Sequence, residues 1–363
     1  MTTSLTSQVP SSCRAVVVGG GVIGASVAYH LSRLGWKDIV LLEQGKITSG
    51  TTWHAAGVVG TTRSTPSETS LSLYGTELYA RLFDETGFDP GFKPCGSCNV
   101  ARTSDRMEAL HRAHGVASSF GIDAKMLTVD QVVERFTHPD TGECGMDVSQ
   151  LRGGIWLPGD GSIGPTDATN ALMAGAKQSG GVSVFEDVRV SSILHRDGKA
   201  TGVETESHGS IEAENVVICA GQWSRQLGHK CGVNIPLHSA EHFYITTKPM
   251  RGVHHNMPVV RDPDLLLYAR EWGNGLLLGC FEEKCKPIFT TSNGDAPDDF
   301  AFQLLNDGAW PTRVCARCAK GFYRTATLSL SICPHPRTNT RTLAPPPPPL
   351  QTGSTSNRIS STL

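Results

Sequence analysis

The chain has 363 residues, a mass of 38.8 kDa and a formal net charge of −2, with 39% hydrophobic and 18% charged residues. These proportions are typical of a globular protein, and a chain of this length usually forms more than one lobe. No apolar run approaches the roughly 18 residues that cross a membrane, and the charge gives no general attraction to nucleic acid. The eleven cysteines are scattered and odd in number, which indicates free thiols.

The first twelve residues are expected to be disordered. They are rich in Ser and Thr and carry no charged side chain. Neither the apolar core of a secretory signal nor the several arginines of a mitochondrial transit peptide are visible there. Two interpretations remain open: a cytosolic protein, or a targeting segment that this sequence does not include.

The folded part opens with a strand, a glycine-rich turn, a helix and a second strand. Residues 15–18 form a continuous apolar run, as expected of a strand buried on both faces. Residues 19–24 (GGGVIG) follow at once, and residues 25–34 predict a helix. The second strand is expected over 38–43.

Each glycine of this turn has a physical task. Gly19 permits the tight turn, Gly21 lets the backbone approach a pyrophosphate, and Gly24 lets the helix pack close to the sheet. The start of the helix offers N–H groups to phosphate oxygens, and Glu43, 19 residues after Gly24, can accept hydrogen bonds from ribose hydroxyls. The arrangement predicts a dinucleotide-binding site. The alternative is a glycine-rich turn in an unrelated α/β fold.

The residues after the second strand favour FAD over NAD. Many residues of 44–57 are small or carry hydroxyl groups, which suits a segment that wraps an extended cofactor. The chain has one glycine fingerprint of this kind, so a reductase that binds two nucleotides is not expected.

Further strands are expected in the second half of the chain. Asp197 and Gly198 form a tight-turn signal between expected strands at 188–194 and 201–205. Residues 215–221 (NVVICAG) predict another buried strand that ends in small residues.

The cysteines and serines give little support to metal or hydrolase chemistry. Two Cys-x-x-Cys spacings, Cys95/Cys98 and Cys315/Cys318, match half of a four-thiolate zinc site each. The pairs are far apart, and Cys98 lies in an apolar, strand-like stretch, so no metal is expected. Ser224 lacks the Gly-x-Ser-x-Gly turn of hydrolases.

The composition changes abruptly towards the C-terminus. Residues 311–363 contain seven Arg or Lys and no Asp or Glu, whereas 1–310 carry 25 basic and 34 acidic residues. The same segment holds eight of the 21 prolines, including the run 345–349. We expect 307–363 to be a disordered tail that is not homologous to the domain before it. The proline run is either passive or a ligand for an SH3-like groove.

Several motifs together resemble one family. Over about 14–306 the chain resembles the amine-oxidising FAD flavoproteins of the D-amino-acid-oxidase type. Within that family it is similar to sarcosine dehydrogenase, dimethylglycine dehydrogenase and the regulatory subunit of pyruvate dehydrogenase phosphatase. The segments that carry the resemblance are 16–24, 35–45, 49–57, 157–161, 165–167 and 217–223.

The resemblance implies an α/β fold with a Rossmann-like FAD-binding lobe and a second α+β lobe built on a mixed or antiparallel sheet. The FAD lobe is expected over about 13–62 and 150–228, and the second lobe over about 75–145 and 232–300. Because chains of the family continue past residue 306, the domain at 13–306 is expected to lack the C-terminal part of its flavin lobe.

The resemblance also implies FAD as the cofactor. In the two dehydrogenases a histidine in the matching Trp-His-x-Ala-Gly segment carries the flavin covalently, so His54 is the expected attachment point; the alternative is a histidine that only packs near the flavin. Val188 is expected to meet the adenine part through its backbone, or else to be a core valine. The full expected cofactor set is Gly19, Gly21, Val22, Ile23, Gly24, Glu43, Gln44, Ser49, Gly50, Thr51, Thr52, His54, Ala56, Gly57, Val188, Ala220, Gly221 and Trp223.

The expected catalytic residues are His242, Tyr244 and Arg270, all in the second lobe. Strands at 244–247 and 265–268 would form a platform over the flavin. His242 and Tyr244 could face a small amine, and Arg270 could bind a substrate carboxylate in a bidentate pair. The alternatives are a structural histidine and a structural or surface arginine.

Two functions follow from the resemblance. One is an FAD-dependent oxidoreductase that oxidises the C–N bond of a secondary or tertiary amino acid such as sarcosine or dimethylglycine, with hydride transfer to flavin N5 and an electron-transfer flavoprotein as electron acceptor. The other is a non-catalytic regulatory protein that binds the catalytic subunit of pyruvate dehydrogenase phosphatase. His54 favours the enzyme, whereas residues 219–223, 236–238, 241–244 and 286–289 are closer to the regulatory subunit.

A truncated, inactive product is a third interpretation. The family implies the mitochondrial matrix as the location, with the cytoplasm as the alternative. Neither a nucleic-acid partner nor a membrane span is expected.

Overall fold

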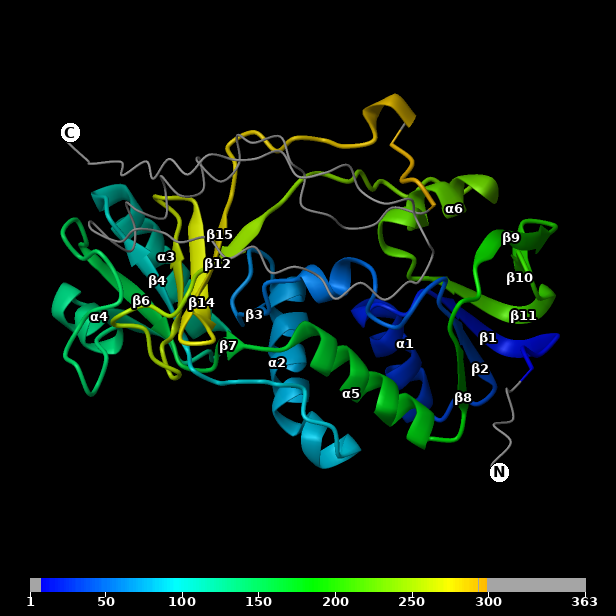
Figure 1. The fold of residues 1–363 in the computed structure, drawn as a ribbon, viewed down its shortest axis with the longest axis horizontal. Helices are drawn as coiled ribbons and strands as arrows, with labels where there is room; N and C mark the ends of the chain where they lie inside the picture. The colour runs from blue at the N-terminus through cyan, green and yellow to red at the C-terminus, as the bar shows by residue number, and fades with distance from the viewer. Residues whose placement is uncertain (1–7, 293, 299–363) are drawn as a thin grey trace, which may run out of the picture. The chain divides into compact units, whose positions relative to one another are not determined.

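Figure 1 shows the computed structural model, which describes residues 8–292 and 294–298. All elements named below belong to the first of two compact units, Met1–Ser331. The expectations for residues 1–7 and 307–363 lie outside the described residues. Within the described residues, no helix is long and apolar enough to cross a bilayer.

The first sheet has six strands in the order β8-β2-β1-β11-β10-β9. Four of them run parallel and two add an antiparallel edge. All of β2 is buried, as expected of a parallel strand covered on both faces. The parallel strands are β1 (Ser12–Val18), β2 (Ile39–Leu42), β8 (Val182–Phe185) and β11 (Gly209–Ile218), and the edge is β10 (Lys199–Thr205) and β9 (Val190–Arg196).

Helices cover both faces of this sheet (Figure 1). On one face α1 (Val22–Arg33), α2 (Pro66–Thr86) and α5 (Pro165–Gln178) share one apolar cluster with β1 and β2. On the other face Leu227 of α6 (Ser224–Lys230) packs with side chains of β1, β2 and β11. β1 lies between β2 and β11, so the strand order reverses beside it. In sheets of this kind ligands bind at that point, at the carboxyl ends of the strands.

The turn between β9 and β10 is the one that the sequence predicts. Asp197 and Gly198 have φ angles of 51° and 74°. Two consecutive positive φ angles are typical of the type I′ turn, which matches the twist of the flanking strands.

The second sheet has seven strands in the order β12-β15-β14-β13-β4-β6-β5. Its only parallel pair among the described strands is β4 with β13, so the sheet is mixed, as expected. The strands are β4 (Ser97–Ala101), β5 (Lys125–Leu127), β6 (Gly153–Leu157), β12 (Tyr244–Thr246), β13 (Val259–Asp262), β14 (Leu267–Trp272) and β15 (Gly275–Cys280).

The strand β6 lies in a different sheet from the one that its place in the sequence suggests. We expected the chain to re-enter the FAD lobe at about residue 150. Instead β6 pairs with β4 on one side and β5 on the other, both in the second lobe. The backbone partners of a strand decide which sheet it joins, and those of β6 are far away in the sequence. The chain returns to the six-stranded sheet with α5.

Helices α3 (Ser104–Ser119) and α4 (Val129–Arg135) cover opposite faces of the second sheet. Leu110 of α3 packs on one face, and Val132 of α4 packs on the other. The chain starts both helices with a threonine cap. Thr128 and the third helical residue of α4 form a reciprocal capping box, and Thr103 accepts a hydrogen bond from the third residue of α3.

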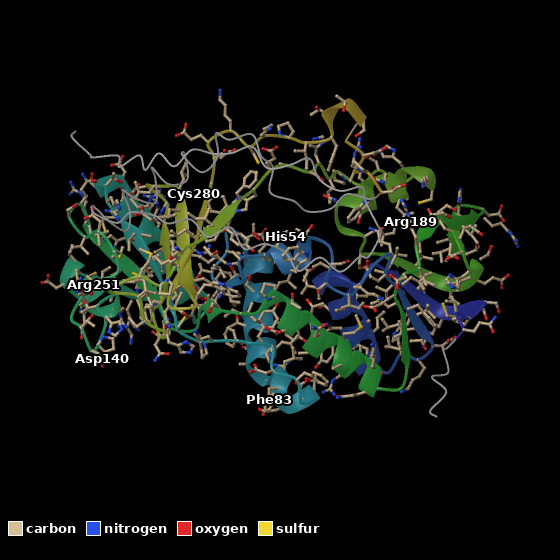
Figure 2. All side chains as sticks on the ribbon, in the orientation of Figure 1. His54, Phe83, Asp140, Arg189, Arg251 and Cys280 are labelled. Atoms are coloured by element: carbon tan, nitrogen blue, oxygen red, sulfur yellow. The ribbon has the colours of Figure 1, made fainter. Side chains whose placement is uncertain are left out.

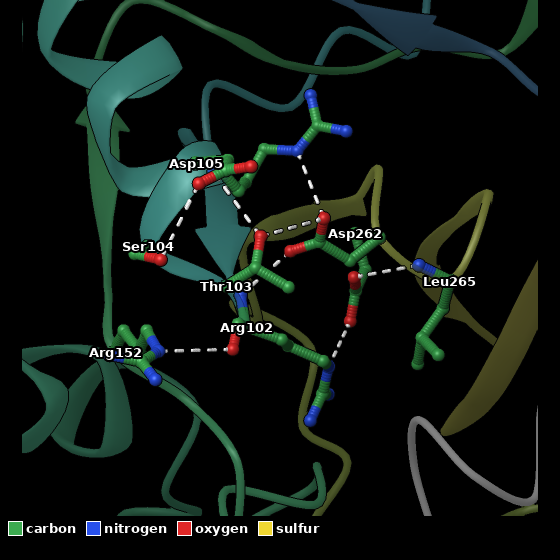
Figure 3. A network of polar contacts seen from close by, with 9 residues as sticks. Arg102, Thr103, Ser104, Asp105, Arg152, Asp262 and Leu265 are labelled. Carbon is green, nitrogen blue, oxygen red and sulfur yellow. Dashed lines mark hydrogen bonds and ion pairs between the residues drawn. The ribbon is translucent and has the colours of Figure 1, made fainter.

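A buried ion pair ties the residue after β4 to the last residue of β13 (Figure 3). Arg102 Nε donates to Asp262 Oδ2 at 2.6 Å, and the two side chains are only 6% and 2% exposed. The other carboxylate oxygen of Asp262 accepts from the backbone N–H of Leu265 at 3.2 Å. A second acid, Asp264, accepts from the Arg102 backbone N–H at 2.8 Å and pairs with Arg106 at 3.2 Å. The network fixes the register between two strands that are far apart in the sequence.

Candidate active site

The glycine turn after β1 is packed so closely that no side chain would fit at two of its positions. Gly19 has a φ of +112°, and a Cβ built on it would lie 2.4 Å from the carbonyl oxygen of Cys219 at the end of β11. A Cβ on Gly24 would lie 1.9 Å from the carbonyl oxygen of Gly19. Both residues therefore carry the tasks that the sequence assigns to them: one permits the turn, and the other lets α1 approach it.

The N-terminus of α1 is held by a side chain from another segment. The cap residue Gly21 offers no side chain, and Thr52 Oγ1 accepts from the backbone N–H of Val22 at 2.9 Å. Thr52 lies in the short helix η1 (Thr51–His54). The first N–H groups of a helix have no partner within the helix. The other backbone N–H groups in the first turn of α1 can therefore donate to an anion. The side chain of Ile23 in the same turn is exposed.

Glu43, the residue after β2, holds the glycine turn in place. Its carboxylate accepts from the N–H of Gly20 at 2.6 Å and of Gly45 at 2.9 Å. Burial raises the pKa of Glu43, and these two hydrogen bonds act against that rise. A carboxylate has about four acceptor positions, so the expected bonds to ribose hydroxyls can be made beside those to the backbone.

The remaining residues of the expected cofactor set line the carboxyl ends of the parallel strands. Val188 follows β8 and is buried, and its N–H donates to the Glu43 carbonyl oxygen at 2.9 Å. Ala220 and Gly221 follow β11. Trp223 Nε1 donates to the carbonyl oxygen of Pro297 at 2.9 Å. The segment after β2 contributes Gln44, Ser49, Gly50, Thr51 and, beyond η1, Ala56 and Gly57.

These residues fit a dinucleotide. The turn leaves room for a pyrophosphate because Gly21 has only one atom near its Cβ position, Thr52 Oγ1 at 3.0 Å. Beside Gly221, the amide Nε2 of Gln222 is buried and has no hydrogen-bond partner in the described structure. An orphaned buried donor is costly unless a ligand or water pairs with it. Gln222 was not among the expected residues, because no spacing rule distinguishes it.

His54 ends η1, and Figure 2 shows it at the short helix between the two sheets. Its ring lies 3.6 Å from the ring of Trp53 at an angle of 37°. Two residues earlier, Thr52 binds the N-terminus of α1. His54 is therefore held close to the expected phosphate site by its own short helix.

One face of the second sheet is apolar and the other carries polar and aromatic side chains. Val260, Ala269 and Leu278 pair across three neighbouring strands on the apolar face and belong to one core cluster. Because side chains alternate along a strand, the residues next to them point the other way. On that face the register aligns Arg261 with Tyr268, and Tyr268 with Gly279.

Tyr268 and His242 meet on this polar face. The Tyr268 hydroxyl lies 3.3 Å from His242 Nε2, and the His242 ring stacks on Phe281 with centroids 5.2 Å apart. A Cβ on Gly279 would lie 2.0 Å from the Tyr268 ring, so the glycine makes room for that ring. The sequence predicts the strand that contains Tyr268 but does not indicate a role for this residue. Its place opposite Tyr244 across Gly279 is visible only once the register is known.

The electrostatics of the pair suit proton transfer. His242 is exposed on its open side, but the rings stacked on it exclude water from the imidazole and lower its pKa. Burial raises the pKa of Tyr268 to about 12. At neutral pH the histidine and the tyrosine are therefore both neutral. With Nε2–H donating to the Tyr268 hydroxyl oxygen, Nδ1 of His242 carries the lone pair that can accept a proton. Tyr244, the third expected residue here, is half-buried on the neighbouring strand β12.

Arg270 lies elsewhere on the same face and ties the two lobes together. Its Nε donates to the carbonyl oxygen of Ala56, and its guanidinium lies 4.8 Å from the centre of the Trp272 ring. The side chain is buried, and burial lowers its pKa. Arg270 therefore lies beside the segment that follows His54, where we expected the active site. The bond to Ala56 uses one of its five N–H donors.

Comparison with known proteins identifies the family. The family model described as "FAD dependent oxidoreductase" matches residues 14–309. The chain belongs to this family. FAD is accordingly its cofactor, and the α/β fold with two lobes is confirmed.

Curated relatives come from animals and bacteria. The mouse pyruvate dehydrogenase phosphatase regulatory subunit is 39% identical over 284 residues, and the match covers 77% of this chain and 31% of that protein. The 4-methylaminobutanoate oxidase (formaldehyde-forming) of Paenarthrobacter nicotinovorans is 40% identical and is matched over 75% and 32%. Human sarcosine dehydrogenase is 34% identical and is matched over 82% and 31%. This chain spans about a third of the length of these relatives.

Among solved structures, L-proline dehydrogenase from P. horikoshii superposes with a TM-score of 0.73 at 22% sequence identity, covering 86% of this chain and 77% of that one. Glycine oxidase from Geobacillus kaustophilus gives 0.65 at 22%, covering 86% and 79%. At this identity the likeness shows the fold alone.

The cysteines do not form a metal centre within the described part of the chain, where no three His, Cys, Asp or Glu side chains gather. Cys98 is fully buried, and burial raises its pKa to about 12. Cys315 and Cys318 lie outside the described residues.

Proposed function

We propose that this chain is the FAD-binding region of an oxidoreductase that oxidises the C–N bond of a secondary or tertiary amino acid. The observation that carries the proposal is the His242–Tyr268 pair on the polar face of the second sheet, in a chain that also has a complete dinucleotide turn. The names of the relatives support the same substrate class: one acts on 4-methylaminobutanoate, another on sarcosine, and a third on dimethylglycine.

FAD held by the glycine turn would supply the two-electron acceptor, with flavin N5 as the position that would receive a hydride from the carbon next to nitrogen. The substrate nitrogen must lose its proton first, because only its lone pair can form the C=N bond as the hydride leaves. His242 is neutral at pH 7 and accepts that proton at Nδ1, while the Tyr268 hydroxyl oxygen accepts from its Nε2–H and holds the imidazole in place. Water then adds to the iminium product, which releases formaldehyde where an N-methyl group was oxidised.

His54 is proposed as the residue that holds the flavin covalently. It carries a nucleophilic imidazole at the end of η1, directly after the threonine and tryptophan that fix this helix. The sequence 51–57 (TTWHAAG) matches the attachment segment of the dehydrogenases described above.

An electron-transfer flavoprotein as acceptor and a mitochondrial location are part of the proposal. Three of the relatives are named as mitochondrial, and another comes from a bacterium. The other interpretation, a regulatory subunit of pyruvate dehydrogenase phosphatase, is not favoured, because the family model and most of the curated relatives above are oxidoreductases.

Acid precipitation of the purified protein tests the covalent attachment of the flavin. Flavin absorbance in the acid pellet is expected, and its loss is expected in His54→Ala but not in His195→Ala, which removes an exposed histidine of the β9 hairpin. Flavin only in the supernatant of the wild-type protein would contradict covalent attachment. Bleaching of the flavin by sarcosine, dimethylglycine or 4-methylaminobutanoate tests the oxidation, and no bleaching by any of them would count against the substrate class.

A further inference from the structure

A pocket of about 470 Å³ opens between the two lobes, and the proposed chemistry does not use it. It is lined by the loop before β4, by the start of α5 and by the turn between β14 and β15. His54, His242 and Tyr268 are not among its lining residues. Pockets of roughly 300–1,000 Å³ at the junction of two lobes are common binding sites, so this one is a candidate for a second ligand or partner.

The pocket lies directly against the segment that follows His54. Arg270 lines the pocket and donates through Nε to the carbonyl oxygen of Ala56. Ile163 lines it as well, and its N–H donates to the carbonyl oxygen of Gly57 at 2.8 Å. Two pocket residues are thus hydrogen-bonded to the backbone just after the proposed attachment point of the flavin. The pocket is therefore on the outer side of the wall of the cofactor site.

An exposed tryptophan lines the same pocket. Trp272 is the last residue of β14 and is 51% exposed. The Arg270 guanidinium lies 4.8 Å from the centre of its ring. Contacts therefore run from the segment after His54, through Arg270, to an indole ring on the protein surface. Tryptophan and arginine are enriched among the residues that dominate binding between proteins, which favours a protein as the occupant of this pocket.

The charges around the pocket balance. Lys93 and Arg270 face Asp167 and Glu271, and His255 is the remaining titratable residue of the lining. Lys93 and Glu271 pair with each other at 2.9 Å. A strongly anionic ligand such as a nucleotide gains little from a balanced lining. A partner that buries the indole gains from the exposed apolar ring, whatever its own net charge.

We propose that this pocket and Trp272 form the docking site of the protein that takes electrons from the reduced flavin, a flavoprotein that inserts an apolar side chain beside the indole. The inference rests on the proposed function and names the surface that its electron acceptor contacts. Reoxidation moves two electrons to the flavin of the acceptor and releases two protons to solvent. Electron-transfer encounters bury little surface, so a single aromatic anchor beside a pocket is enough to direct one.

The test starts from protein whose FAD has been reduced by dithionite without oxygen, so it needs no amine substrate. Stopped-flow absorbance follows reoxidation by purified electron-transfer flavoprotein and, separately, by ferricenium, a small acceptor that needs no docking site. Trp272→Ala should raise the half-saturating concentration of the flavoprotein by about 10- to 100-fold and leave the ferricenium rate unchanged. Surface plasmon resonance with the oxidised protein should show the same loss of affinity without any electron transfer. Phe83→Ala removes an aromatic ring of similar exposure (56%) from α2 and should behave as the wild type does.

Several outcomes would overturn the inference. One is an unchanged half-saturating concentration in Trp272→Ala, and another is a wild-type protein that the flavoprotein reoxidises no faster than buffer does. A parallel loss of the ferricenium rate would show that the substitution disturbs the cofactor site itself. A smaller assembly of Trp272→Ala in light scattering would assign the pocket to a second copy of this chain. Bleaching of the flavin by amines involves neither Trp272 nor the acceptor, so failure of docking is distinguishable from failure of the proposed function.

Discussion

The candidate sites on the two sheets are built from different groups, one from the backbone and the other from side chains. In the six-stranded sheet the site is made of backbone: two glycines approach carbonyl oxygens so closely that a Cβ would overlap them, and Glu43 spends two hydrogen bonds on main-chain N–H groups. In the seven-stranded sheet the site is made of side chains, with His242, Tyr268 and Arg261 on one face and an apolar core on the other. The first sheet suits a cofactor that is held by shape and dipole, and the second suits a substrate that must be deprotonated and oriented.

The largest effect is expected from adding a side chain to the glycine turn of the six-stranded sheet. Gly24→Val places a Cβ 1.9 Å from the Gly19 carbonyl oxygen, so α1 must move away from β1. We expect loss of FAD binding and destabilisation by about 4 kcal/mol or more, measured by flavin content and urea unfolding. Gly75→Ala in α2, where no atom lies within 4 Å of the new Cβ, is the control and should be neutral or slightly stabilising. A folded Gly24→Val protein with normal flavin content would show that close packing is not required.

A second prediction concerns the buried ion pair of the seven-stranded sheet. Asp262→Ala leaves Arg102 buried without its carboxylate, which should cost about 3–5 kcal/mol in the free energy of unfolding. Urea titration followed by circular dichroism measures it. Glu108→Ala breaks an exposed pair in α3 and should change stability by less than about 0.5 kcal/mol. Equal effects of the two substitutions would contradict a role for burial.

A third prediction separates chemistry from cofactor binding. Tyr268→Phe removes the hydroxyl that holds His242 but keeps the ring above Gly279. We expect kcat to fall about 100-fold, while flavin content stays normal and stability falls by about 1 kcal/mol. Stopped-flow reduction of the flavin by substrate measures the step. A normal reduction rate would remove the pair from the mechanism.

The pH dependence of stability gives the smallest expected effect. The pKa of His242 is lower in the folded protein than the ordinary value of 6.5, so the unfolded chain binds a proton more readily. The contribution of His242 is therefore fully present above pH 6.5 and is lost as the pH falls through the folded pKa. His242→Asn should flatten this part of the melting-temperature profile. His254, whose pKa is also lowered, should keep its own contribution in that variant, and an unaltered profile would contradict the assignment.

Much of the cofactor region could be predicted because its signals are local. The turn at 19–24 lies between a buried strand and a helix within about 30 residues, and the Asp197-Gly198 turn is set by two residues. By contrast, the sequence did not place β6 in the second sheet, because nothing near residue 153 shows that β4 and β5 will pair with it.

The sequence by itself determined the dinucleotide turn, the family and the residues that could carry chemistry. It did so because glycines at fixed spacing and unbroken apolar runs act through the chain's own neighbours. Only the tertiary structure decided which candidates act together. His242 meets Tyr268, and Arg261 lies opposite Tyr268 on the same face, because strand register brings distant residues to one face and assigns their hydrogen-bond partners.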